Sequence, residues 1–135
     1  MQVLVDTSVW VEHLRKGDGH LVQLLENGQV ISHPFVISEL ACGNLKNRSV
    51  ILNALSELEK TPTIELDEYM LFIDRNKLHG KGIGFVDVHL LASTLLANAT
   101  LWTADKKLKQ IAIGLSIAYS SEEDIKCHSK SGWRS

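Results

Sequence analysis

The sequence predicts an α/β fold, a three-layer α/β/α domain in which helices cover both faces of a central parallel sheet. Short runs of β-branched and aliphatic residues, typical of buried strands, alternate with longer segments whose apolar residues recur at helical spacing. This alternation is typical of parallel sheets, because a helix returns the chain before the next strand begins. The length of 135 residues, 44% of them hydrophobic, favours a single compact domain.

The first half of the chain predicts two strands, each followed by two helices. Asp6, directly after the first strand, is a typical helix cap. Pro34 suits the first turn of a helix, where its missing N–H group is not needed. The predicted elements are a strand at 3–5, helices at 9–16 and 20–26, a strand at 29–32, and helices at 35–45 and 50–60.

The second half continues the alternation. Gly82 and Gly84 indicate a mobile connector before the most apolar helix, which we expect to be buried centrally. The predicted elements are a strand at 63–66, a helix at 67–78 capped by Asp67, a helix at 85–98, a strand at 100–103, a helix at 105–111 and a strand at 115–119. We therefore expect a domain over residues 1–119 and a flexible polar tail over 120–135.

The bulk composition is that of a soluble cytoplasmic protein. The N-terminus lacks the basic and apolar regions of a signal peptide, and polar residues interrupt the apolar stretch at 86–99, so we expect no membrane association. Cys42 and Cys127 are too few for a disulfide framework and are expected to be reduced thiols. The formal net charge of −2 does not exclude nucleic-acid binding if several acids gather at one site.

Four acidic residues occupy positions that favour such a site. Asp6 and Asp105 follow predicted strands, and in open parallel sheets binding sites form beyond the carboxyl ends of the strands. Glu39 and Asp87 interrupt otherwise apolar helical patterns. Asp6, Asp87 and Asp105 could each be explained as helix caps or first-turn acids. Glu39 is harder to explain in this way. It lies in mid-helix on an apolar face, where we expect it to be buried, and no basic residue three or four positions away could pair with it.

Binding of a divalent cation would explain why all four acids lie at one site. Mg²⁺ and Mn²⁺ take oxygen ligands, and one or two carboxylates usually bind the ion directly while others act through water. Such an ion promotes phosphodiester hydrolysis by lowering the pKa of bound water and neutralising charge on the phosphate. The hydroxyl groups of Thr7, Ser8 and Thr103 lie beside these acids in the sequence and are suited to orienting water, although each could also serve a turn or cap.

Each of the four acids stands in a short motif: VDTSVW around Asp6, ISEL around Glu39, GFVDVHLLAS around Asp87 and LWTADKKL around Asp105. These motifs resemble the acidic motifs of PIN domains, most closely those of VapC-type toxins of bacterial toxin–antitoxin pairs. The resemblance extends from residue 3 to about residue 119, with all four motifs in the expected order.

The resemblance implies an endoribonuclease dependent on Mg²⁺ or Mn²⁺, with Asp6, Glu39, Asp87 and Asp105 as its catalytic acids. Among these, we expect Asp6, Asp87 and Asp105 to lie closest to the metal and Glu39 to act through water or a second ion. The family also implies a structured RNA substrate such as tRNA or rRNA, a cognate antitoxin protein and a homodimer. Lys106 and Lys107 directly follow an acid of the pocket and are candidates for binding the RNA backbone.

Other functions remain open from the residues alone. An aspartate-based phosphatase would require a second acid two residues after Asp6, where this chain has Ser8. A phosphoacceptor signalling domain would require an aspartate after a central strand, and none is obvious. A non-catalytic PIN-like module that binds RNA or protein is the main alternative, although such domains typically lose one or more acids. His89 is expected to point away from Asp87 and to be a polar residue of the core or the dimer surface with its hydrogen bonds satisfied, rather than a metal ligand.

Overall fold

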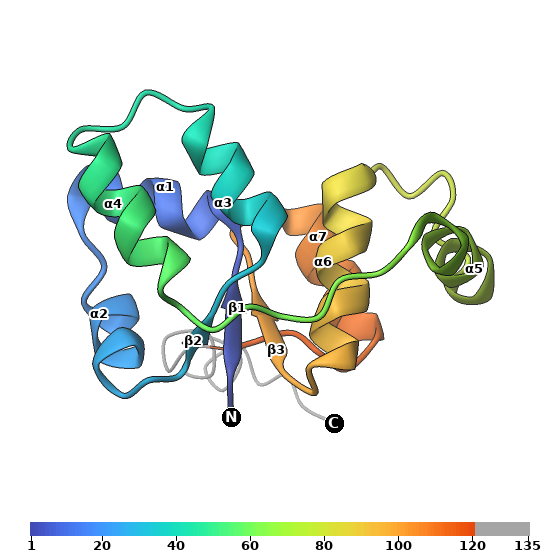
Figure 1. Ribbon diagram of the computed structural model, residues 1–135. Coiled ribbons are helices and arrows are strands. Elements are labelled where there is room, and N and C mark those ends of the chain that lie inside the picture. Colours follow the sequence, from blue (N-terminus) through green and yellow to red (C-terminus); the bar gives the residue numbers. More distant parts are fainter. Residues whose placement is uncertain (121–135) are drawn as a thin grey trace.

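The structure, a computed structural model, describes residues 1–120. Within this part of the chain, three strands and seven helices alternate in the α/β order that the sequence predicts (Figure 1). In chain order they are β1 (Val3–Val5), α1 (Thr7–Lys16), α2 (Gly19–Glu26), β2 (Val30–Ile31), α3 (Pro34–Ala41), α4 (Arg48–Ser56), α5 (Leu66–Asn76), α6 (Phe85–Leu96), β3 (Thr100–Trp102) and α7 (Lys106–Gly114). The predicted tail, Ser120 apart, lies outside the described residues, as does Cys127.

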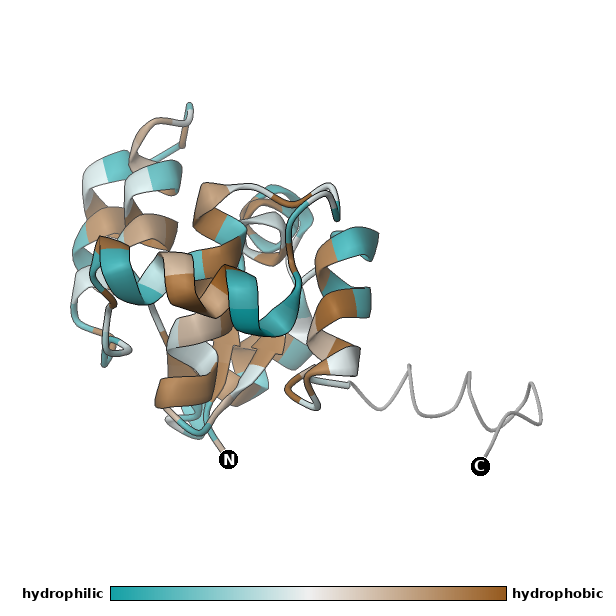
Figure 2. Ribbon diagram, turned by 90° about the vertical axis from the view of Figure 1, so that its right-hand side faces the viewer, coloured by the Kyte–Doolittle hydropathy of each residue, from teal (hydrophilic) through white to brown (hydrophobic). Residues whose placement is uncertain are grey.

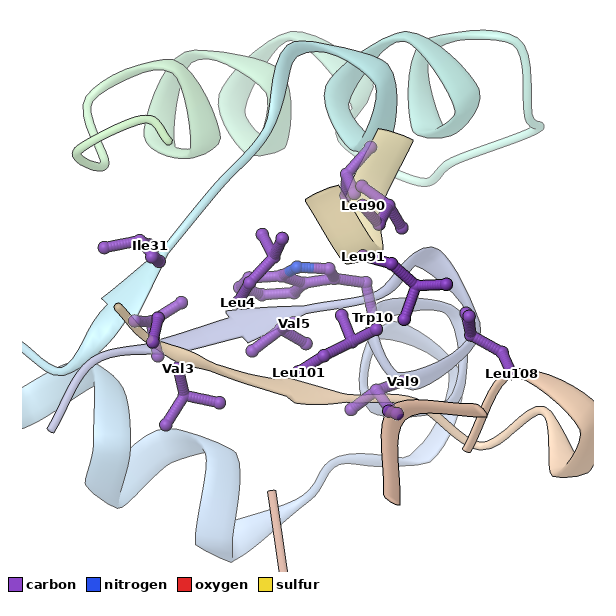
Figure 3. Packing of buried hydrophobic residues seen from close by; sticks show 14 of the residues in the cluster. Val3, Leu4, Val5, Val9, Trp10, Ile31, Leu90, Leu91, Leu101 and Leu108 are labelled. Atoms are coloured by element: carbon purple, nitrogen blue, oxygen red, sulfur yellow. The ribbon is translucent and has the colours of Figure 1, made fainter. Parts of the chain in front are cut away.

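The three strands form a parallel sheet in the order β2-β1-β3. Leu4 of β1 is aligned with Ile31 of β2 on one side and with Leu101 of β3 on the other. All three side chains are buried, which is typical of a parallel sheet whose two faces are covered. Figure 3 shows Leu90 of α6 and Val9 of α1 on opposite sides of these strands, so apolar side chains fill both faces.

Helix α6 is the central helix, as its composition predicts. Its residues from Val88 to Thr94 are all buried. In Figure 2, the strands and the inner parts of the helices are coloured as hydrophobic, whereas hydrophilic segments lie toward the outside. No helix in the described range is both long enough and apolar enough to cross a membrane.

Two predicted strands are wrong. Residues 63–66 form no strand, because pairing with the segment after β2 stops at a bridge between Ser32 and Lys60. Pro62 has no N–H group to continue the ladder, and the chain beyond Ser32 turns into α3. The segment 115–119 forms only a single bridge, between Leu101 and Ala118, which two backbone hydrogen bonds support.

Several helix ends also differ from the prediction. Helix α3 ends at Ala41 rather than at residue 45, and the exposed thiol of Cys42 follows it without a disulfide. Helix α4 ends at Ser56, four residues early. Helix α5 begins at Leu66 with Glu65 as its cap, two residues before the predicted Asp67 cap. The Glu68 carboxylate accepts the Glu65 N–H group at 2.8 Å and so fixes the first turn there.

The carboxyl ends of the strands and the first turns of four helices meet at one edge of the sheet. Asp6 caps α1 directly after β1, His33 caps α3 two residues after β2, and Asp105 caps α7 three residues after β3. Figure 1 shows the strands running upward from the N-terminus, with α1, α3, α6 and α7 beginning near their upper ends. This edge therefore gathers residues that are distant in the sequence, as expected for a parallel sheet.

His33 is a buried histidine that the sequence reading did not single out. Its side chain is fully buried, its Nδ1 atom accepts the Phe35 N–H group at 3.0 Å, and its Nε2 atom lies 3.2 Å from the Ser93 hydroxyl. Because Nδ1 accepts a hydrogen bond, the ring proton of the neutral form lies on Nε2. Its position directly before Pro34 was the available signal, since the residue before a first-turn proline is the helix cap.

We expect His33 to make the fold sensitive to acid. Burial, with a smaller effect from the charge of nearby His89, lowers the pKa of His33 from its ordinary value of 6.5 to about 4. Between these two values the unfolded chain binds the proton more readily than the folded protein, so stability falls as the pH drops from 6.5 toward 4. The loss expected from this one group at pH 4 is about 3 kcal/mol.

Urea unfolding at a series of pH values measures this effect. His33→Asn keeps a cap acceptor and should lose stability less steeply than the unchanged protein between pH 6.5 and pH 4. His79→Asn is the matched control, because His79 is exposed. Equal slopes for the unchanged protein and His33→Asn would show that His33 does not carry the acid sensitivity.

Candidate active site

Asp6 is buried at the end of β1, and three hydrogen bonds hold its carboxylate. The Thr7 N–H group donates to Oδ1 at 2.8 Å, and the hydroxyls of Ser8 and Thr103 donate to Oδ2 at 2.9 and 2.7 Å. Asp6 therefore caps α1, which is the structural role that the sequence also allowed. The three hydrogen bonds hold its carboxylate in a fixed orientation. A carboxylate oxygen can accept more than one hydrogen bond, so capacity remains for a further ligand.

The two hydroxyls also join the end of β3 to the start of α1. Ser8 accepts the Ala104 N–H group at 3.0 Å, and Thr103 accepts the Asp105 N–H group at 3.1 Å. Each hydroxyl donates to Asp6 and accepts from the loop before α7, and Thr103 thereby connects two acids of the predicted site, Asp6 and Asp105. Thr103 is buried, which shields this connection from water.

Glu39 differs from the expectation of a buried acid. It is exposed on α3, because the face of the helix that carries it turns away from the core formed by Val36 and Leu40. Its Oε1 atom accepts a hydrogen bond from the Thr7 hydroxyl at 2.6 Å. Thr7 thus lies between two of the predicted acids, with its N–H group on Asp6 and its hydroxyl on Glu39.

Asp87 lies in the first turn of α6 and is half-buried. The Gly84 N–H group donates to its Oδ2 atom at 3.3 Å. Burial raises the pKa of Asp87, and the negative charges of Asp6, Asp105 and Glu39 raise it further, against the lowering effect of the Gly84 N–H group. Asp6, Glu39 and Asp105 are therefore close enough to Asp87 to act on its carboxylate electrostatically.

Asp105 is the exposed member of the group after β3. Its Oδ1 atom accepts the Leu108 N–H group at 3.0 Å, so it caps α7, and its own N–H group donates to Thr103. One oxygen of its carboxylate is engaged by the cap. The other has no hydrogen-bond partner among residues 1–120.

The donor set fits a hard divalent cation that keeps part of its water shell. The ion pairs within residues 1–120 join Glu12 to Arg15 and Lys16, so none of the four site acids has a basic partner there. In the same range, no group of three His, Cys, Asp or Glu side chains is arranged to enclose an ion alone. Mg²⁺ is usually bound by one or two carboxylates and several waters, which agrees with both observations.

Lys106 and Lys107 are both exposed in the first turn of α7. The Lys107 side chain extends across Gly82 in the connector between α5 and α6, where a Cβ atom on Gly82 would lie 2.9 Å from its Nζ atom. Gly82 also has a φ of 80°, in the left-handed region that favours glycine. The connector and α7 are thus in contact beside the acids.

His89 is buried, but the expectation that its hydrogen bonds are satisfied is wrong. It packs against the rings of Phe35, Tyr69 and Phe85, with centroids 4.5 to 4.8 Å apart. Its Nδ1 atom is buried and has no hydrogen-bond partner within the described chain. The sequence reading missed the Gly84 N–H group as a partner of Asp87, although an acid three residues after a helix cap is the available signal.

Comparisons with known proteins agree with this geometry. The family model for the PIN domain matches residues 3–114. Two relatives named Ribonuclease VapC32, from Mycobacterium tuberculosis strains CDC 1551 / Oshkosh and ATCC 25618 / H37Rv, are each 45% identical over 121 residues. The match covers 89% of this chain and 98% of each relative.

A solved structure supports the fold independently. The crystal structure of PAE2754 from Pyrobaculum aerophilum matches with a TM-score of 0.54 and 17% identity, over 82% of this chain and 79% of that chain. At this identity the likeness concerns the fold alone. The family model, the relatives and the four acids at one edge of a parallel sheet lead to one conclusion. This chain belongs to the PIN-domain family and, within it, to the VapC type.

Proposed function

We propose that this chain is an endoribonuclease that hydrolyses RNA phosphodiester bonds with Mg²⁺ or Mn²⁺, and that it is the toxin of a toxin–antitoxin pair. The observation that carries the proposal is the gathering of Asp6, Glu39, Asp87 and Asp105 at one edge of the sheet without a basic partner among the described residues. The name Ribonuclease of relatives that share 45% of the sequence supports the same activity.

Burial and the negative charges of Asp6, Asp105 and Glu39 oppose ionisation of Asp87. A bound cation would remove this repulsion, so the arrangement is better suited to holding a metal than to stabilising the fold. Asp6, Asp87 and Asp105 are the proposed metal-binding acids, with one or two of them bound directly and the others acting through water. The ion would lower the pKa of a bound water and neutralise charge on the phosphate.

The hydroxyls of the site would act by positioning. Ser8 and Thr103 donate to the same oxygen of Asp6, which leaves this carboxylate little freedom to rotate. Thr7 holds Glu39 at the exposed rim, where its carboxylate could accept a hydrogen bond from an attacking water. Such preorganisation lowers the cost of reaching the reactive geometry.

The proposal also names the substrate and the partners of the enzyme. We propose a structured RNA such as tRNA or rRNA as the substrate, because unpaired bases in loops are the parts of RNA that proteins read most readily. A cognate antitoxin protein would block the acidic groove, and the active form would be a homodimer in the cytoplasm. The VapC name of the relatives supports these assignments by family membership.

Cleavage of total cellular RNA by the purified protein tests the function directly. We expect discrete products with Mg²⁺ or Mn²⁺ and none with a chelator. A mock purification from cells that lack the protein controls for contaminating nucleases. If the folded protein cleaves no RNA with either metal, even after any bound peptide is removed, it is instead a non-catalytic RNA- or protein-binding module.

A further inference from the structure

A pocket of about 600 Å³ lies between α7 and the connector that follows α5. Its volume is within the range of roughly 300 to 1,000 Å³ that ligand sites usually have. The lining contains three lysines, two amides and apolar side chains but no carboxylate. The residues are Asn76, Leu78, Lys81, Lys106, Lys107, Gln110, Ile111, Gly114 and Leu115.

The positive charge of this pocket is not balanced by acidic partners within the described part of the chain. Lys81, Lys106 and Lys107 are exposed, and none of them forms an ion pair or a hydrogen bond within residues 1–120. By contrast, Lys16 pairs with Glu12, and Lys60 donates to the Ser56 carbonyl oxygen. Three like charges around one hollow repel one another unless an anion binds there.

The pocket borders the acidic site by two routes. Lys106 and Lys107 directly follow Asp105. On the other side, the Lys107 side chain covers Gly82, and the connector then reaches Gly84, whose N–H group donates to Asp87. A polyanion that occupies the pocket can therefore continue over the neighbouring acids, where its own charge requires a cation.

We propose that this pocket binds a nucleotide of the substrate RNA next to the scissile bond, a role that rests on the proposed ribonuclease function. Lysine ammonium groups suit the phosphates of a single strand. Asn76 and Gln110 offer amide donors and acceptors to a base or a ribose hydroxyl, above the apolar surface of Leu78, Ile111 and Leu115. The combination of lysines, amides and an apolar floor matches a nucleotide better than a free inorganic anion.

Binding measured without cleavage tests this assignment. The probe is a fluorescein-labelled single-stranded RNA of 12 nucleotides, and anisotropy is recorded in chelator over a series of KCl concentrations. Lys81→Gln/Lys106→Gln/Lys107→Gln is compared with the control Lys16→Gln/Lys46→Gln/Lys60→Gln. Both variants lose three positive charges, and the control lysines are exposed and lie outside the pocket. Circular dichroism and thermal unfolding verify that both variants fold.

We expect the pocket variant to bind RNA at least about 10-fold more weakly, and its salt slope to be shallower by about 2, because each phosphate contact contributes about 0.7 in single strands. The control variant should change affinity less than about 3-fold with an unchanged slope. Equal weakening in both variants would assign the effect to total charge and overturn the pocket. Absence of RNA binding by the unchanged protein would overturn it as well.

The same experiment separates the pocket from the nuclease. If the pocket variant loses RNA binding while the unchanged protein cleaves nothing, the pocket stands and the proposed activity fails. If the pocket variant binds and cleaves like the unchanged protein, the activity stands and the pocket fails. Competition by a glutamate peptide of the same charge, as effective as competition by unlabelled RNA, would assign the pocket to an acidic protein segment instead.

Discussion

Asp6→Asn and Asp87→Asn are each expected to reduce RNA cleavage by at least about 1000-fold, because a metal-held water and its charge neutralisation are worth several kcal/mol in the transition state. Both substitutions preserve side-chain size and remove one negative charge. Asp74→Asn is the matched control, since Asp74 is an exposed acid on α5, outside the acidic group. The measurement is the initial rate of RNA cleavage at saturating Mg²⁺.

The same two substitutions should move stability in opposite directions in chelator. The pKa of Asp87 is raised in the folded protein, so its contribution to stability falls as the pH rises above its ordinary value of 3.8 and stays low at neutral pH. Asp87→Asn removes this cost and should raise Tm by roughly 2 °C. Asp6→Asn weakens three hydrogen bonds to a buried carboxylate and should lower stability by about 1 to 2 kcal/mol.

Thermal unfolding with and without Mg²⁺ measures these changes alongside the cleavage rates. Added Mg²⁺ should raise the Tm of the unchanged protein and of Asp74→Asn, and should do so less for the two site variants. If both site variants fail to fold, the main role of Asp6 and Asp87 is to stabilise the fold as helix caps. If they fold and cleave at the rate of the unchanged protein, the acids are not the catalytic group.

Thr103→Val is expected to lower cleavage by about 10- to 100-fold at limiting Mg²⁺, as losses of groups that orient metal ligands typically do. Valine keeps the shape of threonine but removes the hydroxyl that donates to Asp6 at 2.7 Å and accepts the Asp105 N–H group at 3.1 Å. Two acids of the site would therefore lose their shared support. Because the acids themselves remain, higher Mg²⁺ should restore part of the rate.

Two further variants separate positioning from packing. Thr94→Val is the matched control, because Thr94 is also fully buried but donates only to the Leu90 carbonyl oxygen within its own helix. It should leave cleavage nearly unchanged. Thr103→Ser restores the hydroxyl and should recover most of the rate. Equal loss in Thr103→Val and Thr94→Val would mean that buried threonines support only the fold.

The α/β class, the parallel sheet and the buried central helix could be predicted from the sequence, because hydrophobic periodicity reports how a segment packs. The VLV run of β1 and the apolar pattern of α6 each predict a buried segment, and both segments are buried in the structure. Hydrophobic periodicity could not show that the segment 63–66 forms no strand. Whether a short apolar run becomes a strand depends on a partner being present, and β2 offers none beyond Ser32.

The identities of the four acids were also available from the sequence, since each stands in a short motif of recognisable order. Their arrangement was not. Glu39 was expected to be buried and is exposed, because the rotation of α3 about its axis is set by packing across the sheet. The hydrogen bond from the Thr103 hydroxyl to Asp6 joins residues 97 positions apart in the sequence.

The sequence by itself therefore determined the class of fold and the kinds of side chain that could do chemistry. Only the tertiary structure decided which of them meet. The lysine pocket is the clearest case: Lys81 belongs to a connector and Lys107 to a helix, and they line one hollow because the connector crosses α7 at Gly82. Local patterns record the environment of each segment, whereas contacts between segments arise from packing the whole chain around one core.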